Sequence, residues 1–264
     1  MSQKICLVTG GSSGIGRAIC AGLREKGCTV YEFSRRESQA EGIIHRSVDV
    51  TDEDAVLEAV NRILSEAGHI DVLVNNAGFG ISGAVEFTPL SEAKRQMDVN
   101  FFGMVNVTRA VIGAMRERGN GRVVNVSSVA APAAIPFQTF YSCSKAAIND
   151  YTLALANEVR PYGVTVCAVQ PGDIRTGFTD ARAKNTEGDD LYGGRISRSV
   201  AGMEKDERNG MSPDKAGRKI AAVALKKKSK PLMALGFSYQ FLCVLIKLLP
   251  VRLVNYLVGV LYAR

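Results

Sequence analysis

The chain has 264 residues, of which 46% are hydrophobic and 22% charged, a composition typical of one large globular α/β domain. Its formal charge of +7 could serve nucleic acid, a membrane surface or a phosphorylated cofactor. The densest basic cluster, residues 226–230, is too short to mark a nucleic-acid-binding protein, so we expect no nucleic-acid partner.

Cysteines and histidines give no sign of a metal site. They form no Cys-x-x-Cys pair and no mixed cluster, which argues against zinc and favours reduced thiols. The first residues, Met1–Lys4, lack the basic and then apolar run of a secretory signal. We therefore expect a cytoplasmic protein without a bound metal.

Short apolar runs alternate with segments of helical periodicity. The predicted strands are Ile5–Val8, Val30–Phe33, Ile43–Val48, Val72–Asn75, Val123–Val126 and Val164–Val169. The predicted helices are Gly16–Lys26, Asp52–Ala67, Ser91–Arg118 and Ser142–Arg160. Because these strands are nearly all apolar and helices alternate with them, the pattern predicts an α/β fold: a single doubly wound Rossmann domain over residues 1–264, with a parallel sheet flanked by helices.

The last third of the chain departs from this alternation. Residues 177–213 are polar and contain glycine, which is typical of a lid over a substrate site and also of a plain surface insertion. A last strand is predicted at Leu232–Leu235. Residues 236–264 form an apolar tail, predicted to fold as two short helices, Ser238–Leu249 and Val251–Tyr262, divided by Pro250.

A glycine-rich turn follows the first predicted strand and opens the first predicted helix. Gly10 permits a tight turn, Gly14 lets the backbone approach a pyrophosphate, and Gly16 permits close helix packing. Free N–H groups at the start of the helix attract phosphates. The turn predicts a dinucleotide site formed by Gly10, Ser12, Ser13, Gly14, Ile15 and Gly16.

The end of the second predicted strand indicates which dinucleotide binds. It reads Ser34-Arg35-Arg36, where an NAD-binding protein often carries an acidic residue for the ribose 2′-hydroxyl. Arginine can instead hold a 2′-phosphate through charge-assisted, bidentate hydrogen bonds. The sequence therefore predicts NADP(H) rather than NAD(H), unless these arginines are only solvated surface charge.

Tyr141 and Lys145 stand four residues apart in a predicted helix, which places both side chains on one face. The ammonium group is then expected to favour the phenolate, so that the tyrosine can donate and accept a proton. Such a pair alone is a weak signal, because any helix surface offers many of them.

Taken together, these motifs resemble the short-chain dehydrogenase/reductase family over roughly the first 176 residues. Its Thr-Gly-x-x-x-Gly-x-Gly pattern appears at 9–16, its Asn-Asn-Ala-Gly at 75–78, and its Tyr-x-x-x-Lys at Tyr141 and Lys145. Three separate motifs in the family's order make the resemblance specific. Residues 1–176 would then form the cofactor-binding and catalytic core.

The resemblance implies a catalytic set and further cofactor contacts. The family's serine corresponds to Ser128 rather than to its neighbour Ser127, and its helix asparagine corresponds to Asn100. The implied catalytic residues are Asn100, Ser128, Tyr141 and Lys145. The implied cofactor contacts are Asp49, Val50, Asn76, Ala77, Gly78, Tyr141, Lys145, Pro171, Gly172, Ile174 and Thr176.

In the implied reaction, hydride passes between nicotinamide and a carbonyl carbon while Tyr141 exchanges a proton with the carbonyl oxygen. Ser128 would hydrogen-bond that oxygen, Lys145 would hold the nicotinamide ribose, and Asn100 would hold a water that links Lys145 to solvent. Members of the family are frequently dimers or tetramers, so a homodimer or homotetramer is expected.

The substrate is expected to be a lipophilic secondary alcohol or ketone, because residues 130–137, Phe79 and Phe178 would place apolar groups near the nicotinamide. The long tail is similar to the branch of 17β-hydroxysteroid dehydrogenases, which implies a steroid, bile acid, retinoid or other lipid. The alternative enzyme is a broad carbonyl or 3-oxoacyl reductase.

Two hypotheses of another kind stay open. The tail together with Lys226–Lys230 could hold the protein at a membrane surface, although Lys247, Pro250 and Arg252 interrupt it too often for a spanning helix. Two helices packed over the substrate end are an equally good interpretation. A cofactor-binding scaffold without catalysis is also conceivable, but it would have no need to keep all four catalytic residue types.

Overall fold

A parallel sheet of seven strands forms the centre of the computed structural model, which describes residues 3–37 and 40–263. The strands are β1 (Ile5–Thr9), β2 (Thr29–Ser34), β3 (Ile43–Ser47), β4 (Val72–Asn75), β6 (Gly121–Val126), β7 (Val164–Gln170) and β9 (Leu232–Ala234). Their order is β3-β2-β1-β4-β6-β7-β9, so it reverses direction between β1 and β4. Ligands of such sheets bind at the carboxyl ends of the strands beside this reversal.

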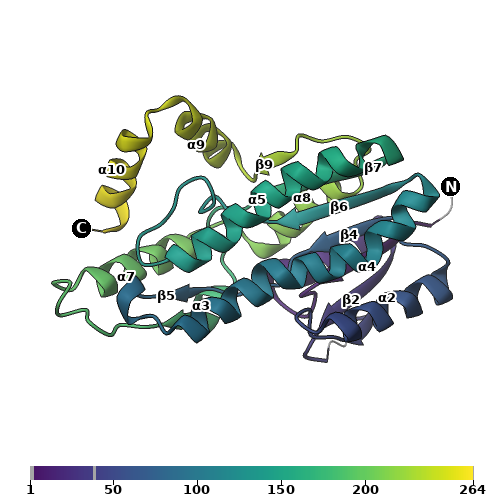
Figure 1. Cartoon of the computed structure of the whole chain (residues 1–264), viewed down its shortest axis with the longest axis horizontal. Helices are drawn as coiled ribbons and strands as arrows, with labels where there is room; N and C mark the ends of the chain where they lie inside the picture. Colours follow the sequence, from purple (N-terminus) through teal and green to yellow (C-terminus); the bar gives the residue numbers. More distant parts are fainter. Residues whose placement is uncertain (1–2, 38–39, 264) are drawn as a thin grey trace.

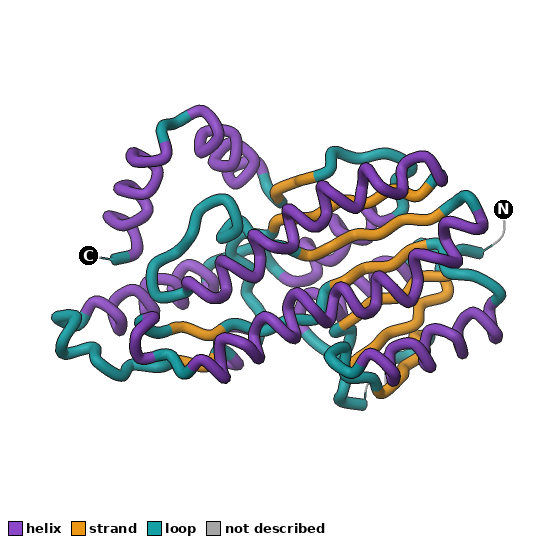
Figure 2. Tube along the Cα trace, viewed as in Figure 1, coloured by secondary structure: helices purple, strands orange, loops and turns teal. Residues whose placement is uncertain are grey.

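Helices cover both faces of the sheet, as predicted (Figures 1 and 2). One apolar core lies between the sheet and α2 (Glu53–Ala67), α4 (Gly103–Arg118) and α5 (Thr139–Val159). The other lies between the sheet and α1 (Gly14–Arg24) and α8 (Pro213–Ala224). Successive β1 residues point to opposite faces, and both faces are buried. This two-sided burial explains why the strands are apolar throughout.

Helix α8 packs closely on α1, although no helix was assigned to residues 213–224 from the sequence. A Cβ atom on Gly217 would lie 2.4 Å from the Cβ of Ala18, and one on Gly22 would lie 3.2 Å from the Cβ of Ala221. The contact is therefore made by small side chains on both helices. Small side chains give a weak periodic signal, which is why the pattern of large apolar residues did not reveal the helix.

The single helix predicted at 91–118 is interrupted. It consists of α3 (Leu90–Met97), a π-turn over Asp98–Phe102, and α4. The N–H of Gly103 donates to the carbonyl of Asp98, five residues earlier, which defines the wider turn. Asn100 lies inside this turn, so the interruption sets the direction of its side chain.

The segment at 177–213 contains more regular structure than its polar sequence suggested. It forms α6 (Phe178–Ala181), β8 (Ala183–Lys184) and α7 (Arg195–Arg208), and β8 pairs with β5 (Ile81–Ser82). Short 3₁₀ turns at Val85–Phe87 and Arg160–Tyr162 complete the elements. The buried residues of α7 include Ile196, which is fully buried, so this helix belongs to the body of the protein.

The tail folds as two helices separated by Pro250, as predicted. These are α9 (Phe237–Leu248) and α10 (Val251–Tyr262), and none of their residues is buried. In Figure 1 they arch away from the body above α5 and α7, and the end of α10 returns toward α7. Arg195 Nε donates to the carbonyl of Ala263 over 2.5 Å, which holds that end. Across the described residues, no helix combines the length and apolarity that a membrane span requires.

Candidate active site

A cavity of about 1230 Å³ opens at the carboxyl ends of the central strands. All twenty residues predicted to contact the cofactor line it, from the glycine-rich turn after β1 to Thr176. The predicted catalytic residues Ser128, Tyr141 and Lys145 also line it, whereas Asn100 lies behind the wall. The cavity continues to the inner sides of α9 and α10, which places the tail at its far end.

The glycine-rich turn has the backbone geometry that a bound phosphate requires. Gly10 and Gly14 have φ angles of +69° and +53°, a region that favours glycine. A Cβ atom on Gly16 would lie only 2.0 Å from the carbonyl oxygen of Gly10, so no larger residue fits there. Ser13 begins α1 without a side-chain cap bond, so the helix N-terminus presents backbone donors to an anion.

The end of β2 presents positive charge to the cavity. Arg35 and Arg36 are exposed lining residues, and Arg35 Nη1 lies 3.9 Å from Asp49 Oδ2. Glu32, the acidic residue of β2, is fully buried, bonds His45 and does not line the cavity. The phosphate-binding turn and the two arginines therefore line the same cavity, whereas the carboxylate of β2 does not.

Ser128, Tyr141 and Lys145 come together from the loop after β6 and from α5. Lys145 is 5% exposed, and its Nζ donates to the carbonyl of Val126 over 2.9 Å. The same Nζ lies 5.6 Å from the centroid of the Tyr141 ring. Both Ser127 and Ser128 line the cavity, but Ser127 Oγ donates to the carbonyl of Lys145 over 3.0 Å, whereas the Ser128 side chain hydrogen-bonds Tyr141.

Asn100 lies next to this group without lining the cavity. Its Oδ1 accepts from Phe79 N over 2.9 Å, and its Nδ2 donates to Ser144 Oγ over 3.1 Å. A Cβ atom on Gly78 would lie 3.0 Å from Asn100 Oδ1 and 3.8 Å from Lys145 Nζ. The π-turn thus brings the asparagine close to the buried ammonium group.

The electrostatics of the pair differ from the simple expectation that Lys145 favours the phenolate. Burial raises the pKa of Tyr141 to about 12, against the opposing effect of its hydrogen bond with Ser128. Burial also lowers the pKa of Lys145 to about 8. The ammonium group makes its hydrogen bond with a backbone carbonyl rather than with the phenol. Removal from water is therefore the main cause of the pKa shift of both groups.

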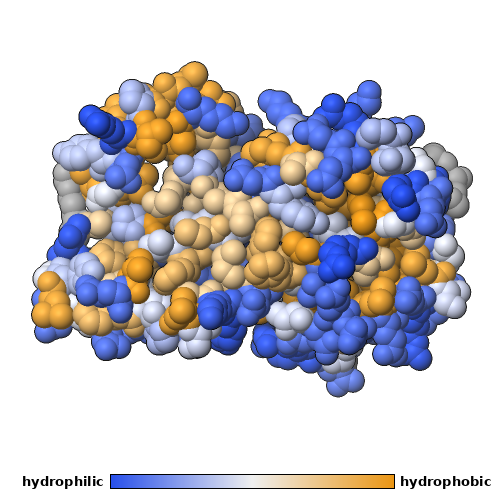
Figure 3. All heavy atoms as spheres, in the orientation of Figure 1, coloured by the Kyte–Doolittle hydropathy of each residue, from blue (hydrophilic) through white to orange (hydrophobic). Residues whose placement is uncertain are grey.

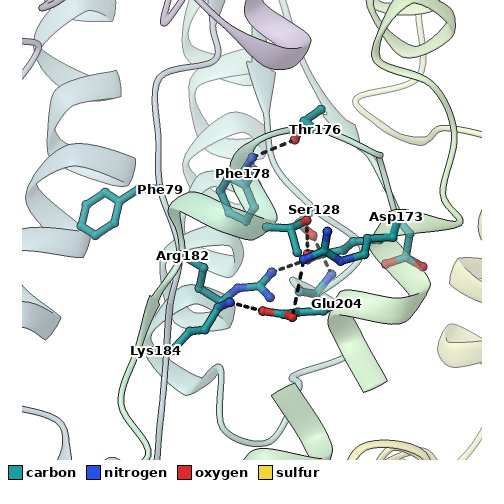
Figure 4. Close-up of polar contacts among 12 residues, drawn as sticks. Phe79, Ser128, Asp173, Thr176, Phe178, Arg182, Lys184 and Glu204 are labelled. Atoms are coloured by element: carbon teal, nitrogen blue, oxygen red, sulfur yellow. Dashed lines mark hydrogen bonds and ion pairs between the residues drawn. The ribbon is translucent and has the colours of Figure 1, made fainter. Parts of the chain in front are cut away.

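An ion pair between a buried arginine and a half-buried glutamate, which the sequence did not reveal, lies beside Tyr141. Arg182, which is 4% exposed, pairs with Glu207 of α7, and Glu207 also accepts from Thr179 Oγ1 over 2.6 Å. In Figure 4 Arg182 lies below the Phe178 ring, and its Cζ is 5.6 Å from the centroid of that ring. Arg182 lowers and Glu207 raises the pKa of Tyr141. Both residues belong to the polar segment 177–213, where nothing in the sequence distinguishes a buried charge from a solvated one.

A second contact that was not foreseen ties the tail to the cofactor end of the cavity. The Tyr239 hydroxyl of α9 donates to the Asp173 carboxylate and accepts from the Asp173 backbone N–H over 3.1 Å. The Tyr239 ring lies so close to Gly172 that a Cβ there would be 2.2 Å from it. Burial, followed by the effect of Asp173, raises the pKa of Tyr239, so the hydroxyl keeps its proton and its role as donor.

The rest of the cavity is mainly apolar. Phe79, Phe178, Ala130, Ala133 and Ile135 line it, in line with the apolar surroundings predicted from the sequence, whereas Phe137 packs beside Tyr192 instead. The tail adds aliphatic side chains from both helices, among them Leu242, Leu245, Ile246, Leu249, Val254 and Val258. The tail therefore contributes a wall of the cavity, as the interpretation of two helices over the substrate end requires.

Comparison with protein families agrees with this fold and site. The model of the short chain dehydrogenase family matches residues 4–187, which include the glycine-rich turn, Tyr141 and Lys145. The chain belongs to this family, and it is therefore an oxidoreductase of the kind that uses a nicotinamide cofactor.

Two curated relatives differ in the substrates that their names give. The chain is 42% identical to a 3-ketodihydrosphingosine reductase of Bacteroides thetaiotaomicron, over 100% of this chain and 99% of the relative. It is 40% identical to an acetoacetyl-CoA reductase of Cupriavidus necator, over 69% and 78% of the two chains. The predicted likeness to the branch of 17β-hydroxysteroid dehydrogenases gains no support from these relatives and stays a prediction.

Solved structures show the same architecture. A short-chain dehydrogenase from Streptomyces avermitilis superposes with a TM-score of 0.85 at 32% identity, over 96% of this chain and 94% of that one. The protein ElxO with NADP bound superposes with a TM-score of 0.74 at 25% identity, over 90% and 99%. The Rossmann-type sheet predicted from the sequence is therefore confirmed.

Proposed function

We propose that this protein is an NADP(H)-dependent oxidoreductase that interconverts a secondary alcohol and a ketone on a long-chain lipid. The observation that carries the proposal is the continuity of the cavity, which runs from Tyr141 to the aliphatic inner sides of α9 and α10. A cavity with one polar end and a long apolar end suits a substrate whose reacting group sits on a hydrocarbon chain. The lipophilic class expected from the sequence has this chemistry.

Within that class, a long-chain amino ketone is the leading substrate. The relative that matches the whole length of the chain, tail included, is named a 3-ketodihydrosphingosine reductase. The acetoacetyl-CoA reductase matches only 69% of this chain. Hydroxysteroids and bile acids fit the apolar lining less specifically, because a rigid ring system has no need of a wall that extends along two helices.

In the proposed mechanism, Tyr141 gives its proton to the carbonyl oxygen during reduction and takes it back during oxidation. Ser128 donates a hydrogen bond to the same oxygen, Lys145 holds the nicotinamide ribose, and Asn100 orders a water beside the Lys145 ammonium. When bound, NADPH supplies the hydride. Gly14 and its neighbours would hold the pyrophosphate and the two arginines the 2′-phosphate.

Removing the two arginines tests the cofactor assignment. The double variant Arg35→Ala, Arg36→Ala should raise the Kd of NADPH by about 100-fold while leaving the Kd of NADH within about two-fold, since only NADPH carries the 2′-phosphate. Fluorescence titration of both cofactors measures this. Arg116→Ala is the control, because Arg116 is exposed in the last turn of α4 and does not line the cavity. A wild-type preference for NADH would contradict the assignment.

Chain length tests the substrate class. For a series of 3-ketones with increasing alkyl chains, kcat/KM should rise by roughly four-fold per added CH₂ until the chain fills the cavity, because each buried methylene stabilises the complex by about 0.8 kcal/mol. The double variant Ile246→Asn, Leu249→Asn should flatten this slope and leave the shortest ketone nearly unaffected. A flat wild-type series would remove the long-chain proposal.

A broad carbonyl or 3-oxoacyl reductase is the second candidate, favoured by the 40% identity to the acetoacetyl-CoA reductase. A screen that compares 3-ketodihydrosphingosine, 3-oxoacyl thioesters and hydroxysteroids with NADPH distinguishes the candidates. Thioesters used at least as well as the amino ketone would favour the second. A preference for hydroxysteroids would restore the steroid prediction.

A further inference from the structure

The hairpin formed by α9 and α10, residues 237–262, is apolar on both of its sides. Its inner side lines the cavity with residues such as Leu245, Leu249 and Val258. Its outer side exposes large apolar side chains that do not line the cavity, including Phe241 (62%), Leu248 (77%) and Val251 (83%). Figure 3 shows apolar atoms gathered over the arch of the hairpin.

This exposure is concentrated rather than scattered. Among the described residues, the hairpin carries eleven of the eighteen large apolar side chains that are exposed, and seven of these eleven do not line the cavity. A helix that is apolar all round is ordinarily covered on every side, and a contiguous apolar patch of this kind marks an interaction surface. The four exposed residues of the inner side face the cavity, where a bound substrate would contact them, so the outer side is the part that needs a partner.

The charge of the sequence identifies the chemistry of that partner. Residues 1–214 contain 23 basic and 26 acidic residues, whereas residues 215–264 contain ten basic residues and no acidic one. The whole positive surplus of +7 therefore belongs to the last fifty residues. Lys247 and Arg252 are exposed on either side of the hairpin turn, so positive charge directly borders the apolar surface.

A second basic group extends this surface. Lys226, Lys227, Lys228 and Lys230 are exposed on the segment that joins α8 to β9. In Figure 1 this segment runs along the same edge of the molecule as α9. Apolar side chains bordered by cations match the interface of a bilayer with anionic lipids, where the apolar groups enter the acyl region and the cations meet the headgroups.

A second copy of the chain is a poorer match. Two hairpins packed face to face would bring Lys247 and Arg252 of both copies together, and residues 215–264 contain no Asp or Glu to pair with them. Like charges across an interface are unfavourable. The charge pattern therefore favours an anionic surface over self-association of the tail.

We propose that the α9–α10 hairpin lies in the interface of an anionic bilayer, with its outer side among the lipids and its inner side as the cavity wall. A lipid substrate would then pass from the bilayer along the hairpin into the cavity without crossing water. The proposal of membrane binding depends only on the apolar outer side of the hairpin and on the basic residues beside it. Only the delivery of substrate rests on the proposed function.

Vesicle flotation tests the binding. The full-length protein should float with phosphatidylglycerol vesicles and stay at the bottom with phosphatidylcholine vesicles. The triple variant Phe241→Ser, Leu248→Ser, Val251→Ser should bind about 100-fold more weakly, since it removes three side chains that would be buried in lipid. The control replaces Leu57, Leu90 and Leu191 by serine. These residues are exposed on the body and lie outside the cavity, and their loss should not change binding.

Charge and folding are tested separately. Replacing Lys226, Lys227 and Lys228 by glutamine should weaken binding to phosphatidylglycerol by about 100-fold, and added salt should weaken wild-type binding in the same direction. All variants should keep wild-type turnover of a short, water-soluble ketone, because none of the changed residues lines the cavity. The proposal would be overturned if the protein still floated normally after loss of the three outer apolar side chains or of the three lysines.

Two other results would also overturn it. One is wild-type protein that binds neither kind of vesicle. The other is a wild-type dimer in light scattering that the serine triple variant converts to a monomer, which would make the hairpin an interface between copies. Failure of the proposed function has a different signature: the protein would float with phosphatidylglycerol vesicles yet show no dependence of kcat/KM on chain length.

Discussion

Tyr141→Phe should lower kcat by about 10³-fold in the ketone-reducing direction, because the phenol is the proposed proton donor and positioned general acids contribute about 10²- to 10⁴-fold. The rings of Phe and Tyr have the same shape, so the contact with Phe178, at 5.8 Å between ring centroids, should persist. Single-turnover kinetics with NADPH measure the chemical step, and fluorescence titration measures the Kd of NADPH, which should stay within about two-fold of wild type.

Tyr151→Phe is the matched control for this prediction. Tyr151 lies on the same helix and packs against Phe101, with ring centroids 6.0 Å apart, but it does not line the cavity. Loss of its hydroxyl should leave kcat nearly unchanged. If Tyr141→Phe kept most of its activity, the proton would have to come from another group and the proposed role of Tyr141 would be wrong. Equal losses in both variants would point to a defect of helix α5 as a whole.

The nucleotide half of the site could be predicted from the sequence because local sequence determines its backbone. Gly10, Gly14 and Gly16 stand between an apolar strand and a helix, and each is required by a φ angle or a close contact that the structure contains. Apolar strands without alternation predicted burial on both faces, and α1 and α5 cover opposite faces of the sheet. In these elements the local preference and the global fold agree.

The substrate half could not be predicted in the same way. Arg182 and Glu207 look like surface charges in the sequence, and only the packing of α7 against α6 brings them together beside Tyr141. Helix α8 contacts α1 through glycine and alanine, which carry little periodic signal. The link from Tyr239 to Asp173 joins residues 66 positions apart. Contacts of this range depend on tertiary structure and leave no local pattern.

The tail shows how one sequence feature can carry two signals. Its apolar residues predicted both a wall over the substrate and a membrane surface, and the sequence offered no means of assigning residues to either. In the structure, Leu245 and Leu249 line the cavity, whereas Phe241 and Leu248 face outward. The two interpretations therefore concern different residues of the same helices. For this reason the variants used in the vesicle experiment can change the outer side without changing the cavity.

Lys145→Met should abolish most of the turnover and yet stabilise the protein in the absence of cofactor. Burial lowers the pKa of Lys145 from its ordinary value of 10.5 to about 8, so the folded state binds this proton less tightly than the unfolded state does. At pH 7 the difference costs about 3 kcal/mol of folding free energy. Methionine removes that cost and loses the bond to the Val126 carbonyl, worth about 1 kcal/mol, so the net gain should be about 2 kcal/mol.

The sign of the pH dependence separates this prediction from a simple packing effect. Between pH 8 and 10.5 the unfolded wild-type protein holds a proton at Lys145 that the folded protein has released, so wild-type stability rises with pH across this range. The advantage of Lys145→Met should therefore be complete below pH 8 and should vanish as pH approaches 10.5. Urea unfolding of both proteins at pH 7 and pH 10 measures it.

Lys94→Met is the control, since Lys94 is exposed on α3 and its replacement should shift stability by less than about 0.5 kcal/mol at either pH. A Lys145→Met variant that is less stable than wild type at pH 7 would mean that the ammonium group is held charged by favourable contacts. A buried lysine that destabilises the fold and is required for turnover fits a site where function opposes stability. If Lys145 destabilises the fold in this way, the cofactor that it is proposed to hold should restore part of the lost stability. Added NADPH should therefore stabilise the wild-type protein more than Lys145→Met.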